Sequence, residues 1–83
     1  MTNQETAQAF ADGHVEGANT AHSMYIRDNR IYSYGEHFII AQRNGANDAV
    51  VTNRKYSTTT SKHTGMVLRA LEAEGYDVTR KTL

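Results

Sequence analysis

The chain has 83 residues, enough for one small domain with a single hydrophobic core. Hydrophobic residues make up 39% of it and charged residues 22%, which is typical of a folded globular domain and excludes a disordered chain. Nine basic side chains balance nine acidic ones, and there is no cysteine. The overall charge therefore indicates no polyanionic partner, and disulfides and thiolate metal sites are excluded.

Residues 1–21 predict a weak helix followed by a loop. Thr2 or Asn3 can cap the helix, and Gly13 is a natural stop. Because the apolar stripe of this helix is thin, we expect it to dock through Phe10 alone.

Residues 22–57 predict an antiparallel β-meander of three to five strands. Asp28 and Asn29 form a two-residue hairpin turn, which sets Tyr25 opposite Tyr32. Strand alternation then places apolar or small side chains on one face and tyrosines on the other. The first face holds Met24, Ile26, Ile31 and Ser33, and the second holds Tyr25, Tyr32 and Tyr34.

The stretch at 31–41, IYSYGEHFIIA, is interrupted by Gly35, where we expect a turn or bulge with positive φ. Residues 37–42 form the third strand and residues 49–52 the fourth. A short return through 55–57 adds an edge strand.

Residues 58–75 predict a strong helix, and residues 76–83 a short strand or tail. The hydroxyl run at 58–61 offers several N-caps, and Gly65 allows close packing over the sheet. The apolar stripe, predicted to pack near Ile39 or Val50, consists of Met66, Val67, Ala70 and Leu71. The whole chain is thus one α+β domain: an antiparallel meander with the C-terminal helix on one face and a short N-terminal helix.

The histidines do not have the spacing of a metal site, and we expect no metal, cofactor or enzymatic activity. Glu36 and His37 are neighbours in an extended segment, so their side chains point to opposite sides. His37 and His63 can meet only if the strong helix crosses the sheet at that point. A His-dependent nuclease is therefore only a third hypothesis.

Two surfaces are candidates for binding. The tyrosine face can stack on bases, contact a protein, or be buried under the weak helix and loops. The helix start with Lys62 is either a phosphate cradle or a redundant cap beside a solvated lysine. The candidate partner-binding residues are Tyr25, Tyr32, Tyr34, Arg54, Lys55, Tyr56 and Lys62.

Two strings carry a resemblance: YSYGEHFIIA at 32–41 and YSTTTSKH at 56–63. They resemble a group of small, uncharacterised domains encoded by bacteriophages and mobile elements. In that group a YSYG-x-HF-x-IA stretch precedes a YS-x-TT-S-x-H stretch, and the similarity covers most of residues 10–72. The resemblance implies a phage accessory protein in the host bacterial cytoplasm. It also implies one structural cluster, in which His37 and His63 are hydrogen-bonded to hydroxyls, formed by Tyr34, Gly35, His37, Thr59, Thr60 and His63.

From these observations we expect a non-enzymatic phage accessory protein that binds and occupies a host protein, such as a defence component in the manner of an anti-CRISPR inhibitor. The alternative is a small nucleic-acid-binding domain that uses the tyrosine face and the basic helix N-terminus. We expect no membrane contact, and the sequence is compatible with a homodimer.

Overall fold

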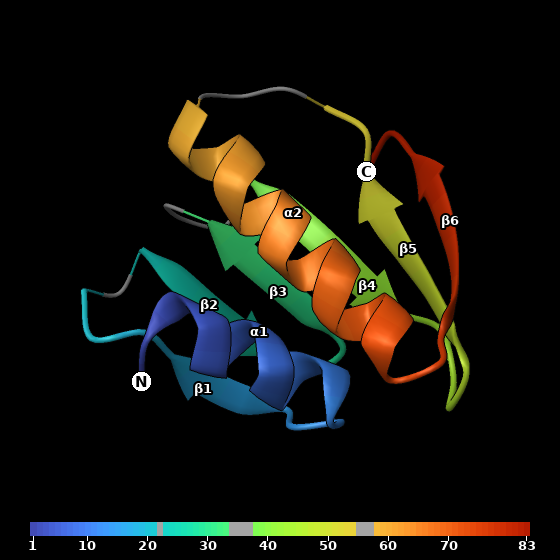
Figure 1. Ribbon diagram of the computed structural model, residues 1–83, viewed down its shortest axis with the longest axis horizontal. Coiled ribbons are helices and arrows are strands. Elements are labelled where there is room, and N and C mark those ends of the chain that lie inside the picture. The colour runs from blue at the N-terminus through green and yellow to red at the C-terminus, as the bar shows by residue number, and fades with distance from the viewer. Residues whose placement is uncertain (22, 34–37, 55–57) are drawn as a thin grey trace.

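A computed structural model of the protein describes residues 1–21, 23–33, 38–54 and 58–83. Both helices lie on the same face of a six-stranded sheet (Figure 1). The helices are α1 (Asn3–Ala11) and α2 (Thr58–Ala73), and the strands are β1 (Glu16–Ala18), β2 (Met24–Arg27), β3 (Arg30–Ser33), β4 (Ile39–Arg43), β5 (Asp48–Thr52) and β6 (Asp77–Lys81). The predicted α+β fold with a meander and a C-terminal helix is confirmed.

The sheet has six strands, more than the three to five predicted for the meander, because β1 and β6 add one strand at each end. Its order is β1-β2-β3-β4-β5-β6, with antiparallel pairs from β1 to β5 and a parallel β5–β6 pair joined through α2. β1 lies in the segment predicted to be a loop. Residues 76–83 were predicted to form a short strand or a tail, and the structure shows the strand β6 there. The predicted edge strand at 55–57 lies outside the described residues.

Helix α1 is capped as predicted but docks through more than one side chain. The Thr2 side chain accepts a hydrogen bond from the Glu5 N–H, and the Glu5 carboxylate accepts one from the Thr2 N–H, which forms a capping box. Its buried residues are Thr6, Ala7, Ala9, Phe10 and Ala11. Docking through Phe10 alone is therefore wrong, because the small alanines let the helix backbone approach the core closely.

The β2–β3 hairpin has the predicted register. Tyr25 is opposite Tyr32 and Ile26 is opposite Ile31, and Asp28 at the turn has a φ of 56°. Met24, Ile26, Ile31 and Ser33 are all buried, Met24, Ile26 and Ile31 within the core that the helices cover.

A bulge in β4 changes which residues of that strand face the helices. Ile31 pairs with Ala41, but Tyr32 pairs with Ile39, so Ile40 is the extra residue. Ile40 and Ala41 are both fully buried in the core cluster, whereas Ile39 is half-buried outside it. Gly35, where a bulge or turn was expected, lies outside the described residues.

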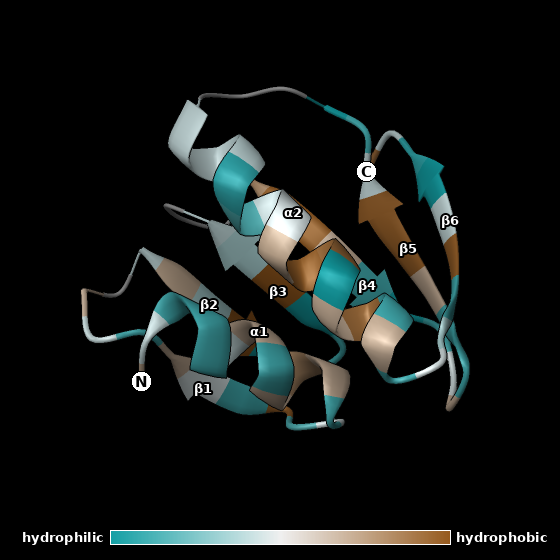
Figure 2. Cartoon of the chain, viewed as in Figure 1, coloured by the Kyte–Doolittle hydropathy of each residue, from teal (hydrophilic) through white to brown (hydrophobic). Residues whose placement is uncertain are grey.

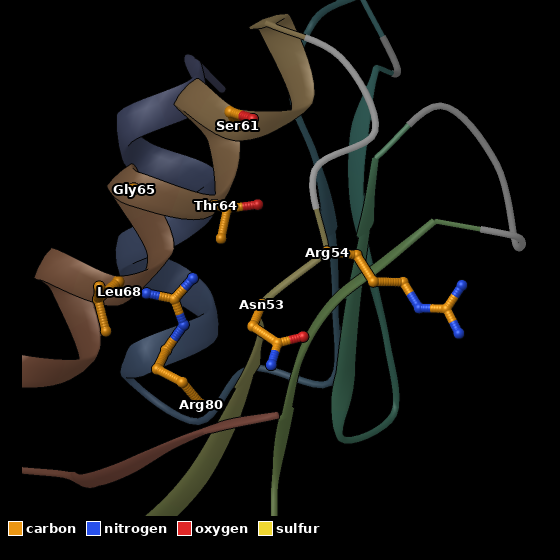
Figure 3. Close-up of a pocket in the computed structure, with 7 residues that line it drawn as sticks. All are labelled: Asn53, Arg54, Ser61, Thr64, Gly65, Leu68 and Arg80. Atoms are coloured by element: carbon orange, nitrogen blue, oxygen red, sulfur yellow. The ribbon is translucent and has the colours of Figure 1, made fainter. Parts of the chain in front are cut away.

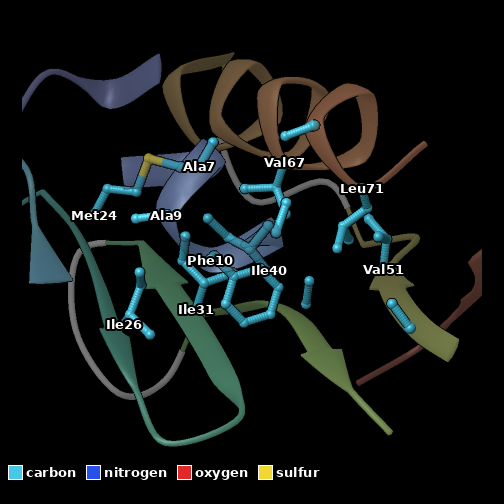
Figure 4. Packing of buried hydrophobic residues seen from close by; sticks show 14 residues of the cluster. Ala7, Ala9, Phe10, Met24, Ile26, Ile31, Ile40, Val51, Val67 and Leu71 are labelled. Carbon is cyan, nitrogen blue, oxygen red and sulfur yellow. The ribbon is translucent and has the colours of Figure 1, made fainter. Parts of the chain in front are cut away.

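The core lies between the two helices and strands β2 to β5 (Figure 4). Val67 and Leu71 of α2 pack in one cluster with Ile40 and Val51. The predicted contacts with Ile39 or Val50 are therefore wrong by one residue in each strand, since the bulge and the strand alternation turn these side chains to the opposite face.

The stripe of α2 also differs from the prediction. Thr60, His63 and Thr64 continue the buried face toward the N-terminus, while Met66 is only partly buried. The helix begins at Thr58, so the N-cap position falls on residue 57, outside the described residues. At its other end, Tyr76 N–H donates to the Leu71 carbonyl and Gly75, with a φ of 84°, reverses the chain.

Gly65 lies within α2, but the prediction that it allows close packing over the sheet is wrong. A Cβ at this position would meet only the Arg69 Nη1 atom, at 3.4 Å. Gly65→Ala is therefore expected to raise the free energy of unfolding by about 0.5–1 kcal/mol, because alanine favours the helix. Denaturant unfolding measures this change. A loss of stability would mean that space beside Gly65 is needed for folding.

Candidate functional site

A buried hydrogen-bond network joins three elements at His63. The His63 Nδ1 atom lies 2.9 Å from the Ser33 Oγ atom of β3, and its Nε2 atom lies 3.3 Å from the Asn3 Nδ2 atom of α1. His63 is 2% exposed, and Ser33 has no exposed surface. Both ring nitrogens thus have partners, which is what a buried imidazole requires.

The network extends to the N-terminal loop. The Asn19 side-chain amide donates to the Asn3 side-chain oxygen and, at 2.8 Å, to the Ser23 hydroxyl. Asn19 also accepts a hydrogen bond from the Met24 N–H through its side-chain oxygen. The network therefore links Asn19 to α1 directly and to α2 through the contact between Asn3 and His63.

A serine beside a histidine is also the raw material of nucleophilic catalysis. Here both side chains are buried, so a substrate cannot reach the Ser33 oxygen without opening the core. The geometry favours a structural role for this pair.

Of the residues expected to cluster with His63, the described part of the chain includes Thr59 and Thr60, and only Thr60 joins the network. Thr60 is 2% exposed, and its Oγ1 atom lies 3.4 Å from the Ser33 hydroxyl, so it joins the network. Thr59 is exposed. Tyr34, Gly35 and His37 lie outside the described residues. In the described part of the chain, no three histidine, aspartate or glutamate side chains gather as a metal site would require.

Burial lowers the pKa of His63 below its ordinary value of 6.5. The folded chain therefore holds this ring neutral at a pH where the unfolded chain protonates it, so stability is lost as the pH falls below about 6.5. We expect the free energy of unfolding to decrease between pH 7.5 and pH 5, as measured by urea unfolding at each pH. His63→Gln should remove part of this decrease, whereas His14→Gln, at an exposed site, should keep it. Equal acid sensitivity in both variants would contradict the assignment.

The sheet face opposite the helices, here called the distal face, carries two parallel rows of side chains. The strand registers place Arg27 opposite Arg30, and Arg30 opposite Gln42. The polar row consists of Glu16, Arg27, Arg30 and Gln42, and the apolar row of Ala18, Tyr25, Tyr32 and Ile39. Within the polar row, Arg30 Nε donates to Gln42 Oε1 at 2.9 Å.

Tyr25 and Tyr32 stack on each other in the apolar row. Their ring centroids are 5.0 Å apart and their planes differ by 12°. Tyr32 is only 8% exposed, whereas Tyr25 is half-buried. The stack uses one face of each ring, and the near-complete burial of Tyr32 leaves Tyr25 as the more accessible ring of the pair.

Lys62 and the two tyrosines do not share a surface. Lys62 is exposed on α2, which covers the opposite face of the sheet. Arg54 follows β5 and is one of the residues lining a pocket between α2 and the β5–β6 edge, yet its side chain points away from α2 (Figure 3). Lys55 and Tyr56 lie outside the described residues, as does Tyr34.

Sequence reasoning missed the polar row. Arg27 and Arg30 were not named as candidate binding residues, although the same alternation that groups the tyrosines places them beside Tyr25 and Tyr32. Their signal was the hairpin register itself, which was predicted correctly.

Comparisons with known proteins give one result. A family model described as a family of unknown function (DUF8033) matches residues 2–82. No curated protein and no solved structure matches the chain. The expectation of an uncharacterised family is thus confirmed. In the described residues, neither helix is long and apolar enough to span a membrane.

Proposed function

We propose that this chain, which belongs to that family of unknown function, is a non-enzymatic binding module whose distal face occupies a partner protein. The observation that carries the proposal is the pair of rows on that face, one aromatic and apolar and one rich in arginine. Both helices pack on the other side of the sheet, so neither covers these rows.

The composition of the two rows suits a protein partner. Tyrosine and arginine are among the residues that most often dominate the energy of protein interfaces. Tyr25 and Ile39 are half-buried beside exposed Arg27 and Arg30, which gives an apolar strip with a polar rim.

The ring geometry favours a protein over single-stranded nucleic acid. Base stacking needs an exposed aromatic face. The Tyr25 and Tyr32 rings already stack on each other, and Tyr32 is almost fully covered. The accessible part of the half-buried Tyr25 is suited to contacts with side chains and backbone of a partner.

The biological setting in this proposal rests on the motif resemblance described above. We infer a phage accessory protein that acts in the host bacterial cytoplasm by occupying a host protein, with a defence component as the preferred target. A chain of zero formal net charge is compatible with blocking a protein surface.

The test is a comparative pull-down from bacterial lysate, followed by binding measurements on the purified partner. Arg27→Glu reverses one exposed charge of the polar row and is expected to weaken binding about tenfold or more. Lys62→Glu makes the same charge change on α2 and should leave binding unchanged. Circular dichroism checks that both variants are folded. A partner retained equally by both variants would contradict the distal face as the binding surface.

Nucleic acid remains the second candidate, because Arg27 and Arg30 are adjacent cations beside a tyrosine pair. A phosphate-binding surface loses affinity steeply as salt increases.

The start of α2 is a separate candidate phosphate site. If it binds phosphate, Lys62→Ala should weaken oligonucleotide binding and flatten its salt slope. We expect no such binding, and micromolar, salt-sensitive binding of a generic oligonucleotide would overturn the protein-binding proposal.

A further inference from the structure

β6 ends the sheet, and its outer edge has no strand beside it in the described part of the chain. The strand is exposed along most of its length and mainly hydrophilic, in contrast to the apolar β5 next to it (Figure 2). Exposed edge strands pair readily with further strands, so their side chains decide whether and with what they pair.

The backbone of β6 presents two residues to this outer edge. Asp77 N–H donates to the Asn47 carbonyl at 2.7 Å, and the Lys81 carbonyl accepts from the Asn53 N–H at 3.1 Å. The backbone groups of alternate residues point to opposite sides of a strand. Val78 and Arg80 therefore direct their N–H and C=O groups away from β5.

We propose that the outer edge of β6 pairs with β6 of a second copy of this chain, antiparallel and centred on Thr79. In this register Val78 faces the partner's Arg80, so the outward backbone groups of both residues are exchanged as narrow hydrogen-bonded pairs. The two-fold axis lies at Thr79, and the two sheets join into one.

The charges of β6 select this register. On the distal face Asp77 lies opposite the partner's Lys81, once on each side of the axis, and Thr79 lies opposite its own copy. Opposite charges and threonine pairs directly across an antiparallel ladder are stabilising. A shift that centres the pairing on Arg80 instead sets two arginines against each other.

The neighbouring strand adds a second reason. Asp77 is the register partner of Asp48 in β5, so two carboxylates lie side by side on the distal face. A lysine from a second copy beside Asp77 offsets this repulsion. Isolated charges on an edge strand usually prevent pairing. Here the order of charges makes the strand complementary to itself and not to an uncharged edge.

This inference goes beyond the proposed function and does not depend on it. Pairing through β6 would place two distal faces side by side in one sheet, so a partner with two matching sites would bind with increased avidity. A single strand pair is far below the ~1,200–2,000 Å² typical of stable complexes, so we expect a weak dimer whose population rises with concentration.

Sedimentation velocity of the full chain from about 10 µM to about 1 mM tests the proposal. We expect a shift from monomer to dimer in this range. Asp77→Lys sets lysine opposite lysine, and Lys81→Asp sets aspartate opposite aspartate. Each variant should weaken self-association about tenfold or more. Lys62→Asp makes the same charge change as Lys81→Asp but on α2, and this variant should self-associate like the unchanged chain.

The decisive measurement is the mixture of the two variants. Asp77→Lys and Lys81→Asp chains are each expected to be monomeric alone and to form a heterodimer together, because all their cross-strand charges are then opposite. Amide hydrogen exchange should slow at Val78 and Arg80 when the chain dimerises. A chain that stays monomeric at about 1 mM, or a mixture that does not associate, would overturn the proposal.

Discussion

Leu71→Ala is expected to lower the free energy of unfolding by about 2–5 kcal/mol. Leu71 has no exposed surface and packs in the core cluster with Val51 and Ile40 (Figure 4). Removing its side chain forfeits the transfer energy of the buried methyl groups and leaves a cavity that the sheet cannot fill. Urea unfolding monitored by circular dichroism measures the loss.

Leu68→Ala is the matched control, because Leu68 lies on the same helix but is only partly buried. Its cost should be clearly smaller than that of Leu71→Ala. Domains of this size have stabilities on the order of 4–12 kcal/mol, so the Leu71 variant can approach the unfolding threshold. Equal small losses in both variants would contradict the burial of Leu71.

The local elements were predictable where the sequence carries its own signal. The hairpin follows from Asp28 and Asn29 and from the alternation around them. The body of α2 follows from its apolar period and from Gly75 at its end.

Features that depend on distant partners could not be predicted. Glu16–Ala18 has little strand propensity and forms β1 because it pairs with β2. The bulge at Ile40 lies in the continuous apolar run at 38–41, where alternation gives no indication of which residues face the core. A parallel partner for β6 requires the crossover through α2.

The candidate site was predicted only in part, because some of its contacts are local and others join distant elements. Stacking of Tyr25 and Tyr32 follows from the hairpin register, so it could be inferred locally. The network of His63, Ser33 and Asn3 joins residues from three elements, and no spacing in the sequence connects them. A hydroxyl partner for His63 was expected from the resemblance, but Ser33 was not named as that partner.

The two proposals fail in different ways. If Arg27→Glu loses binding to the lysate partner but sediments like the unchanged chain, the substitution affects the distal face and not the β6 edge. If Asp77→Lys sediments differently but its monomer binds the lysate partner as the unchanged chain does, the substitution affects the β6 edge and not the binding rows.

The second large effect is expected at Phe10, where Phe10→Ala should lower the free energy of unfolding by about 3–5 kcal/mol. The ring is fully buried, and the Arg43 guanidinium carbon lies 4.9 Å from its centroid. Arg43 also donates through Nη2 to the His14 carbonyl at 3.0 Å and to the Asp28 carbonyl at 3.1 Å. The phenyl ring thus supports the cation that ties the end of α1 to the β2–β3 turn.

A double-mutant cycle separates the contribution of the ring face from that of its volume. Phe10→Leu keeps most of the apolar volume and removes the aromatic face above Arg43, and Arg43→Met removes the cation. The Arg43 Nε atom is buried and makes no hydrogen bond within the described residues, and the guanidinium lies over the Phe10 ring. A cation–π contact of this kind contributes about 0.5–2 kcal/mol, and we expect the two substitutions to be non-additive by that amount. Additive losses in urea unfolding would show that Phe10 acts through volume alone, and that α1 is held by packing without help from the arginine.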